Sequence, residues 1–243
     1  MLFAHAGPYL DAMSQPASMP PDPPAPAPCP EPQPPAAGPL IGPPAPHRAE
    51  PPVAGELRAC RLCADRFAAT ATAHAPRPVV WFARGARVLV ASQAPGLRVH
   101  QSGRPFTDAS GRRLREWMGV DEATFYDRSR VAIVPMGFCF PGYDARGSDL
   151  PPPAICAATW RGRVLDELRP RVTLLIGGYA IRWHLGLRDV TAAVAGWRDH
   201  APAVWPLPHP SWRNTGWLKR NPWFQAELVP ALQQTLGDML EPR

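Results

Sequence analysis

The chain has 243 residues and a formal net charge of +6 at pH 7, and 35 of its residues are proline. No window approaches the ~20 apolar residues of a transmembrane helix, and the first ten residues lack the basic and long apolar stretches of a secretory signal, so we expect a cytoplasmic protein rather than a membrane or secreted one. The basic balance suits a nucleic-acid partner without proving one, because a general preference for arginine would give the same excess.

Composition divides the chain near residue 53. Roughly half of the prolines precede Val53, among alanines and few aromatic residues. Such a segment cannot bury enough apolar surface to offset its chain entropy, so residues 1–53 are predicted to be a disordered tail, which includes Cys29. Residues 54–243 are enough for one hydrophobic core and are predicted to form a single domain.

Apolar runs alternate with amphipathic stretches along the domain. A short edge strand is expected at 79–82, central strands at 88–92 and 131–135, and further strands at 172–177 and 204–207. Helices are expected at 111–118, 153–168, 179–185 and 223–240. The last helix would begin with Asn221 as its N-cap and Pro222 at N1. This alternation predicts an α/β fold, a three-layer α/β/α sandwich around a four-stranded, mainly parallel sheet.

Two of the predicted strands end in loops with unusual chemistry. The strand at 88–92 breaks at Ala-Pro-Gly (94–96), where proline removes a backbone donor and glycine permits positive φ. The strand at 204–207 runs into Pro-His-Pro-Ser (208–211). Because ligands bind beyond the carboxyl ends of parallel strands, both loops are expected to meet at one crevice.

Four cysteines of the domain have a spacing typical of metal ligands. They are Cys60, Cys63, Cys139 and Cys156. The first two are separated by two residues, which directs both sulfurs toward one site, and the last two flank a loop rich in glycine and proline. From the spacing alone, an iron–sulfur cluster, zinc and ordinary buried cysteines remain open. Disulfides are disfavoured without a secretion signal.

Taken together, these motifs resemble the uracil-DNA glycosylase superfamily over roughly residues 56–232. The family's first motif, Gly-(Gln/Glu)-x-Pro-(Gly/Tyr), is Ser-Gln-Ala-Pro-Gly at 92–96 here, and its second is His-Pro-Ser at 209–211. Ser-Gly-Arg-Pro-Phe at 102–106 looks like the segment that stacks an aromatic ring on the flipped base. The resemblance implies a parallel α/β/α sandwich that acts as a monomer on single- or double-stranded DNA.

The cysteine order is similar to that of the iron–sulfur subgroup of this superfamily, the family-4 and family-5 enzymes. That resemblance implies a [4Fe–4S] cluster on the same four cysteines, with zinc as the less favoured alternative. Its expected role is structural, pinning the segment at Cys60 and the loop between Cys139 and Cys156 beside the DNA.

The implied activity is that of a monofunctional DNA glycosylase that removes uracil in base-excision repair. The target base must leave the helix before its N-glycosidic bond can be reached. His209 is expected to donate a hydrogen bond to the charge that gathers on uracil O2, aided by Gln93 and the backbone around it. The residues expected to contact the base or its nucleotide are Ala94, Pro95, Gly96, Phe106 and Ser211. The residues expected to contact the DNA are Arg104, Trp212, Arg213, Lys219 and Arg220.

Two departures from the family pattern affect the expected chemistry. Ala94 stands where the best-studied uracil enzymes have a water-orienting Asp or Asn, and Asp108 is the carboxylate nearest to it in the sequence. Pro135 stands where family-4 enzymes have a base-reading Asn, although proline has no side-chain or backbone donor. These departures keep two alternatives open: a glycosylase for other deaminated bases such as hypoxanthine or xanthine, and a non-catalytic, metal-stabilised DNA-binding protein.

Overall fold

The computed structural model describes residues 50–240, which contain one four-stranded parallel sheet. Its strands are β1 (Val88–Ala91), β2 (Val131–Ile133), β3 (Val172–Ile176) and β4 (Val204–Leu207), in the order β2-β1-β3-β4. All three neighbouring pairs are parallel, and Val88 pairs with both Val131 and Val172. The α/β sandwich expected from the sequence is confirmed. Most of the predicted tail, with Cys29, lies outside the described residues.

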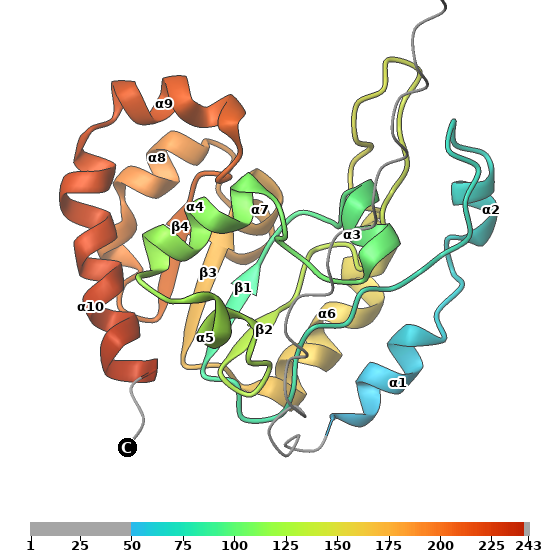
Figure 1. Ribbon diagram of the computed structural model, residues 1–243, viewed down its shortest axis with the longest axis horizontal. Helices are drawn as coiled ribbons and strands as arrows, with labels where there is room; N and C mark the ends of the chain where they lie inside the picture. Colours follow the sequence, from blue (N-terminus) through green and yellow to red (C-terminus); the bar gives the residue numbers. More distant parts are fainter. Residues whose placement is uncertain (1–49, 241–243) are drawn as a thin grey trace, which may run out of the picture. The chain divides into compact units, whose positions relative to one another are not determined.

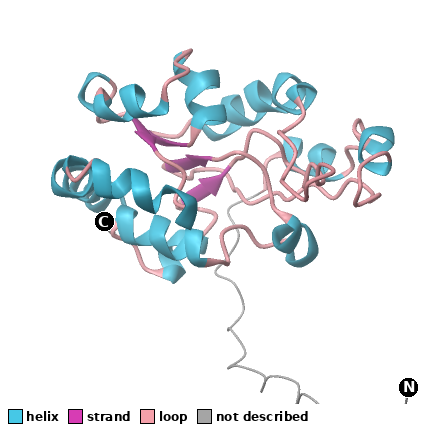
Figure 2. Ribbon diagram, turned by 90° about the horizontal axis from the view of Figure 1, so that it is seen from above, coloured by secondary structure: helices cyan, strands magenta, loops and turns pink. Residues whose placement is uncertain are grey.

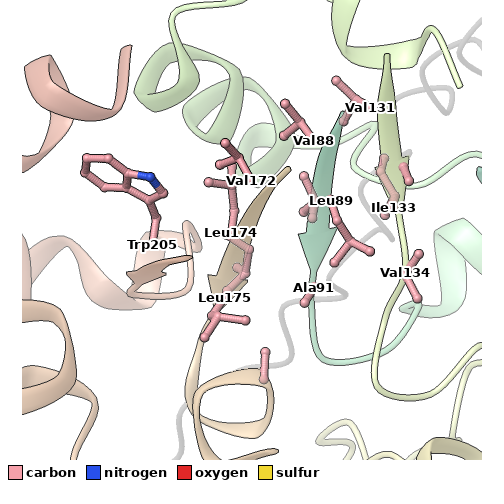
Figure 3. Packing of buried hydrophobic residues seen from close by; sticks show 14 of the residues in the cluster. Val88, Leu89, Ala91, Val131, Ile133, Val134, Val172, Leu174, Leu175 and Trp205 are labelled. Atoms are coloured by element: carbon pink, nitrogen blue, oxygen red, sulfur yellow. The ribbon is translucent and has the colours of Figure 1, made fainter. Parts of the chain in front are cut away.

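The strands form here because their side chains are apolar on both faces of the sheet. Every residue of β1 and β2 is buried, and Leu89, Leu174 and Ile176 are fully inaccessible to solvent. Figure 3 shows the side chains of these strands packed on both sides, with Trp205 of β4 beside them. Burial on both faces is what a parallel sheet covered by helices requires.

Helices cover both faces of the sheet, as Figure 2 shows. Helix α4 (Ala109–Met118) contacts α10 (Val229–Leu240), while α7 (Gly178–Leu185) and α8 (Val190–Ala195) pack on β3 and β4 (Figure 1). The β1–β2 and β2–β3 connections run in opposite directions across the sheet. Because such crossovers are right-handed, these two connections cover opposite faces. Helix α6 (Ala154–Leu168) forms the β2–β3 connection.

The edge of the sheet differs from the sequence expectation. Residues 79–82 form no strand: Trp81 makes a single antiparallel bridge to Ile133, and the Val79 N–H donates to the Phe138 carbonyl at 2.8 Å. Strand β2 lies at the edge instead of the centre, and it ends at Ile133. An apolar run reveals that a strand is buried but not which strands lie beside it.

The C-terminal helical run begins differently from the expected capped helix. The side-chain amide of Asn221 donates to the Trp217 carbonyl at 2.9 Å, so it closes α9 (Thr215–Arg220) instead of capping the next helix. The following turns, Phe224–Leu228, have π-helical hydrogen bonding before the chain continues as α10. The predicted N-cap at Asn221 is therefore wrong.

Several short helices carried too little periodicity to be predicted. They are α1 (Pro52–Arg58), α2 (Ala64–Ala68), α3 (Leu97–Ser102), α5 (Glu122–Tyr126), α8 and α9. Helix α1 packs on α6 and buries Val53, so the helical part begins two residues before the boundary expected at residue 54. Among residues 50–240, no helix is long and apolar enough to span a bilayer.

Candidate active site

A cavity of about 440 Å³ opens at the carboxyl ends of the strands. Its walls come from the loop after β1 (residues 92–99), the segment 105–108, Pro135 after β2, and His209 after β4. The two loops that the sequence singled out therefore line one cavity, because parallel strands end at the same edge of the sheet. The volume lies within the range of small-molecule sites, which hold about 300–1,000 Å³.

His209 is held with one ring nitrogen bonded and the other left for the cavity. The backbone N–H of Ser211 donates to Nδ1 of His209 over 3.2 Å. Nδ1 is thus an acceptor, and the proton of the neutral ring sits on Nε2, which has no partner among the described residues. Burial lowers the pKa of His209, and the carboxylates of Asp108 and Asp149 oppose that shift. The site therefore favours a neutral histidine that donates from Nε2.

Two side chains hold the backbone of the His209–Ser211 segment in place. The Asn214 side-chain amide donates to the His209 carbonyl at 2.7 Å, and Arg113 donates to the Ser211 carbonyl at 3.0 Å. Gly177, at φ +79°, lies beside His209, and a Cβ added there would be in ordinary van der Waals contact with the Cβ of His209 at 3.5 Å. Arg113, which comes from α4, carried no signal in the sequence because its partner lies nearly one hundred residues away.

Phe106 lines the cavity in a strained backbone conformation. Its φ is +55°, a region that side chains other than glycine rarely adopt, and its side chain is only 8% exposed. The Tyr126 hydroxyl donates to the Phe106 carbonyl at 2.8 Å and also to the Pro105 carbonyl. Gly111 allows α4 to approach, because a Cβ there would lie 1.8 Å from the Phe106 oxygen. Surrounding contacts thus hold the ring at the cavity wall.

The loop after β1 is joined to the loop after β2 by backbone hydrogen bonds. Met136 N–H donates to the Ser92 carbonyl at 2.8 Å, and Gly137 N–H donates to the Gln93 carbonyl at 3.0 Å. The candidate residues of the first motif, Gln93, Ala94, Pro95 and Gly96, all line the cavity. The hydrogen bonding between β1 and β2 therefore continues past the ends of both strands and sets the position of Gln93 relative to Pro135.

Among the polar cavity residues to which the sequence assigned no role are Asp108, Tyr143 and Asp149. Asp108 caps α4, accepting from the N–H groups of Ser110 and Gly111. Tyr143 and Asp149 come from the loop between Cys139 and Cys156. Nothing local marks Tyr143 or Asp149 as site residues, because only the folded loop carries them to the cavity.

The residues expected to contact DNA differ in whether their side chains are exposed or bonded within the protein. Trp212 is 75% exposed, the most of any large apolar side chain described, with Arg213 above its ring at 5.9 Å. Lys219 and Arg220 are exposed on α9. Arg104 instead bonds Glu122 at 2.9 Å and lies 3.8 Å from the centre of the Tyr126 ring. These contacts support the segment that carries Phe106. The contact of Arg104 with DNA stays a prediction.

The four domain cysteines come together away from the cavity. They line one small apolar hollow of about 20 Å³, with Cys60 and Cys63 between α1 and α2, Cys139 after β2, and Cys156 in α6. All four are free thiols. Within residues 50–240, no three His, Cys, Asp or Glu side chains are arranged to hold a metal ion. The cysteines thus surround a common space without converging on one point.

Burial dominates the chemistry of the two inner cysteines. It raises the pKa of Cys139 to about 12 and that of Cys156 to about 11, and the nearby thiols raise both further. The Phe138 N–H donates to Sγ of Cys156 at 3.4 Å. A backbone N–H directed at sulfur stabilises a thiolate, which is the form that binds metals. Without a metal, the raised pKa values keep both thiols protonated at neutral pH, and the Phe138 N–H is the contact that favours a thiolate.

Comparison with known families agrees with the fold and the cavity. Residues 79–233 match the family model of the uracil DNA glycosylase superfamily, and this segment is more than half of the chain. The protein therefore belongs to the uracil DNA glycosylase superfamily. Membership indicates a DNA glycosylase of deaminated bases that acts in DNA repair. The match includes both strand-end loops and Phe106, but it begins after Cys60 and Cys63, so it does not address the iron–sulfur subgroup.

Proposed function

We propose that this protein is a monofunctional glycosylase that hydrolyses the N-glycosidic bond of uracil in DNA. The observation that carries the proposal is the neutral His209, whose Nδ1 is occupied by the Ser211 N–H and whose Nε2 is left for a ligand in the cavity. A flipped uracil would enter with its O2 toward this donor. As the bond breaks, negative charge gathers on O2, and a preorganised donor there is commonly worth about 3–4 kcal/mol.

The walls of the cavity suit a flat base. Phe106 offers an aromatic face, and stacking on such a face contributes roughly 1–3 kcal/mol per base. The strained backbone of Phe106 and its contacts to Tyr126 and Gly111 hold the ring before the base arrives. Gln93 lies on the same wall and would orient the nucleotide or a water molecule.

The surface beside His209 suits a DNA strand. Trp212 follows the His-Pro-Ser loop directly, and its large exposed ring would fill the space that the flipped nucleotide leaves in the helix. Arg213, Lys219 and Arg220 would neutralise backbone phosphates near this wedge. Ser211, half-buried at the start of the same segment, would contact the phosphate of the flipped nucleotide.

A broader choice of bases is the second candidate, and the wall beside Pro135 favours it. Proline has no N–H, and its carbonyl lies 3.4 Å from a guanidinium nitrogen of Arg161. The next two N–H groups, on Met136 and Gly137, are already bonded to the loop after β1. This wall therefore offers no backbone donor to a base edge, which favours acceptance of hypoxanthine or xanthine beside uracil.

We further propose that Cys60, Cys63, Cys139 and Cys156 hold a [4Fe–4S] cluster, with zinc as the alternative. When bound, the group would supply a structural crosslink between the α1–α2 segment, the loop after β2 and α6. Anaerobically purified protein should show broad absorbance near ~400 nm and stoichiometric iron. Zinc without iron would favour the alternative. Protein that contains neither iron nor zinc would overturn the proposal.

Single-turnover cleavage of oligonucleotides that contain one uracil, hypoxanthine or xanthine tests the proposed activity. Wild type should produce alkali-sensitive sites, and His209→Ala should lose roughly 100-fold or more in rate while it still binds DNA. His200→Ala is the matched control, since His200 precedes β4 and so lies at the amino-terminal ends of the strands, opposite the cavity. Cleavage of uracil alone would favour the narrow specificity. DNA binding without any cleavage would leave the non-catalytic binding protein as the better description.

A further inference from the structure

The loop between Cys139 and Cys156 contains a compact hairpin, residues 142–150. Tyr143 and Asp149 form an antiparallel bridge, and the Leu150 N–H donates to the Gly142 carbonyl at 2.9 Å. At the tip, Oδ1 of Asp144 accepts from the N–H groups of Arg146 and Ser148. Figure 1 shows the segment as a projecting olive loop between β2 and α6. The hairpin is therefore a defined element with its own hydrogen bonds.

Asp149 reaches the active-site cavity through this hairpin. Residues opposite each other in an antiparallel pair point to the same face, and both Tyr143 and Asp149 line the cavity. Tyr143 is half-buried, whereas Asp149 is exposed. Asp149 thus stands at the mouth of the cavity. A flipped nucleotide inserts its base deeply and leaves its sugar at the mouth, so this carboxylate would face the sugar and not the base.

Asp149 has charged neighbours but no hydrogen-bond donor to its carboxylate among the described residues. It interacts electrostatically with His209 and Arg213. Burial raises the pKa of Asp149, while Arg213 and His209 oppose that shift. The other ionisable groups that line this cavity are Arg98, Asp108 and Tyr143.

Asp108 is the other carboxylate of the cavity, and it is more constrained. Its Oδ1 accepts from the backbone N–H of Ser110 at 3.2 Å, from that of Gly111 at 3.3 Å, and from the Ser110 hydroxyl at 2.5 Å. These bonds tie Asp108 to the start of α4. Ala94, in the first motif, has no polar side chain at all. Water activation therefore lacks an obvious group in the sequence motifs.

We propose that Asp149 orients the attacking water and accepts its proton, an inference that rests on the glycosylase activity proposed above. The water oxygen forms a bond to C1′ as the C1′–N1 bond breaks, and the electron pair of that bond leaves with the base. His209 Nε2–H stabilises the anionic base at O2, and the proton lost by the water passes to the Asp149 carboxylate. The same carboxylate faces the positive charge that develops on the sugar.

Asp149→Asn tests this role, with Asp144→Asn as the matched control. The control removes a charge from the same hairpin and keeps an oxygen that can accept the two tip N–H bonds. In single-turnover cleavage of uracil-containing DNA, Asp149→Asn should be slower by roughly 100-fold or more, the usual contribution of a general base. DNA affinity should not fall, because the substitution removes a negative charge near phosphates. Asp144→Asn should stay within about threefold of wild type.

A pH profile separates chemistry from mere support of the hairpin. The wild-type rate should fall at acid pH as Asp149 takes up a proton, and this limb should be absent in Asp149→Asn. The inference is overturned if wild type cleaves while Asp149→Asn is equally fast, or if Asp108→Asn carries the loss instead. Wild type that cleaves no deaminated base would overturn the proposed function, and this inference with it.

Discussion

The Ser211 backbone N–H donates to Nδ1 of His209 over 3.2 Å, so the main chain itself selects the tautomer of the candidate catalytic histidine. Two residues of one loop thereby decide which nitrogen carries the proton. Since Nδ1 is an acceptor, Nε2 carries the proton, and no carboxylate among residues 50–240 accepts a hydrogen bond from it. A histidine oriented in this way donates while neutral, in agreement with the lowered pKa of His209.

Replacing Ser211 by proline should remove that N–H without forcing the backbone. Ser211 has φ −66°, close to the angle that proline imposes. We expect Ser211→Pro to slow single-turnover cleavage by roughly tenfold or more and to raise the pKa of His209, because neutral Nδ1 loses its donor. Ser211→Ala keeps the N–H and should leave that pKa unchanged. Equal pKa values of His209 in the two variants, measured by NMR, would contradict the tautomer argument.

Gly111→Ala should displace Phe106. An added Cβ would lie 1.8 Å from the Phe106 carbonyl oxygen, so either α4 or the strained segment must move. Overpacking of this kind costs about 1–3 kcal/mol of unfolding free energy, and the stacking wall of the cavity moves with it. Urea unfolding and single-turnover cleavage should both report a loss. Gly237→Ala is the control, because nothing lies within 4 Å of its added Cβ; it should stabilise α10 by roughly 0.5–1 kcal/mol.

Trp212→Ala should separate cleavage of duplex DNA from cleavage of single strands. Because the Trp212 side chain is 75% exposed, the substitution should leave the unfolding free energy nearly unchanged. A wedge is needed only where a base must be replaced in a stack, so cleavage of duplex substrate should slow while single-stranded substrate is cut at the wild-type rate. Trp183→Ala, which removes another exposed tryptophan, is the comparison. An equal loss on both substrates would argue for a direct contact with the flipped nucleotide instead.

Charge removal on α9 should change the salt dependence of DNA binding. If Lys219 and Arg220 each contact one phosphate, the double alanine variant should lower the slope of log K against log salt by about 1.8, at about 0.9 per contact. The measurement is a series of binding titrations between low and moderate salt. The control is Arg171→Ala. Arg171 is exposed just before β3, at the amino-terminal ends of the strands, so this variant should keep the wild-type slope. An unchanged slope in the double variant would show that Lys219 and Arg220 do not contact DNA phosphates.

The pair formed by buried Arg161 and half-buried His184 should make stability depend on pH. Arg161 donates to Nε2 of His184 at 3.1 Å through its Nε. Burial, with the Arg161 charge second, lowers the pKa of His184 to about 3 from its ordinary 6.5. Between those values the unfolded chain binds a proton that the folded protein rejects, so stability rises with pH across this window, by at most about 1.4 kcal/mol per pH unit. Above pH 6.5 His184 is neutral in both states, so the stability that acid removes is fully present there.

His184→Gln keeps an oxygen that can accept from Arg161 and removes the titrating group. Its urea-derived unfolding free energy should therefore vary less between pH 4 and 6.5 than that of wild type. His200→Ala, which lies outside this pair, should keep the wild-type dependence. If both variants show the wild-type slope, other groups carry the acid sensitivity.

Much of the local structure follows from patterns of a few residues. The strands at β1, β3 and β4 and the helices α4, α6 and α7 were all predicted to within about two residues, since each is a continuous apolar or amphipathic run. Gly186 ends α7 at φ +71°, a position where glycine meets no steric penalty. The two strand-end loops line one cavity because parallel strands share an edge. Short-range chemistry of this kind is visible in a single sequence.

Only the tertiary structure decided the remaining site chemistry, because it depends on contacts between distant residues. Arg113 reaches Ser211 across about one hundred positions, and Asp149 enters the cavity on a hairpin whose sequence looks like an ordinary surface loop. Arg104, for which a DNA contact stays a prediction, lies against Tyr126 and Glu122 within the protein. The sequence by itself determined the residue types and the sheet, while burial and charge in three dimensions decided which nitrogen, carboxylate and ring face the cavity.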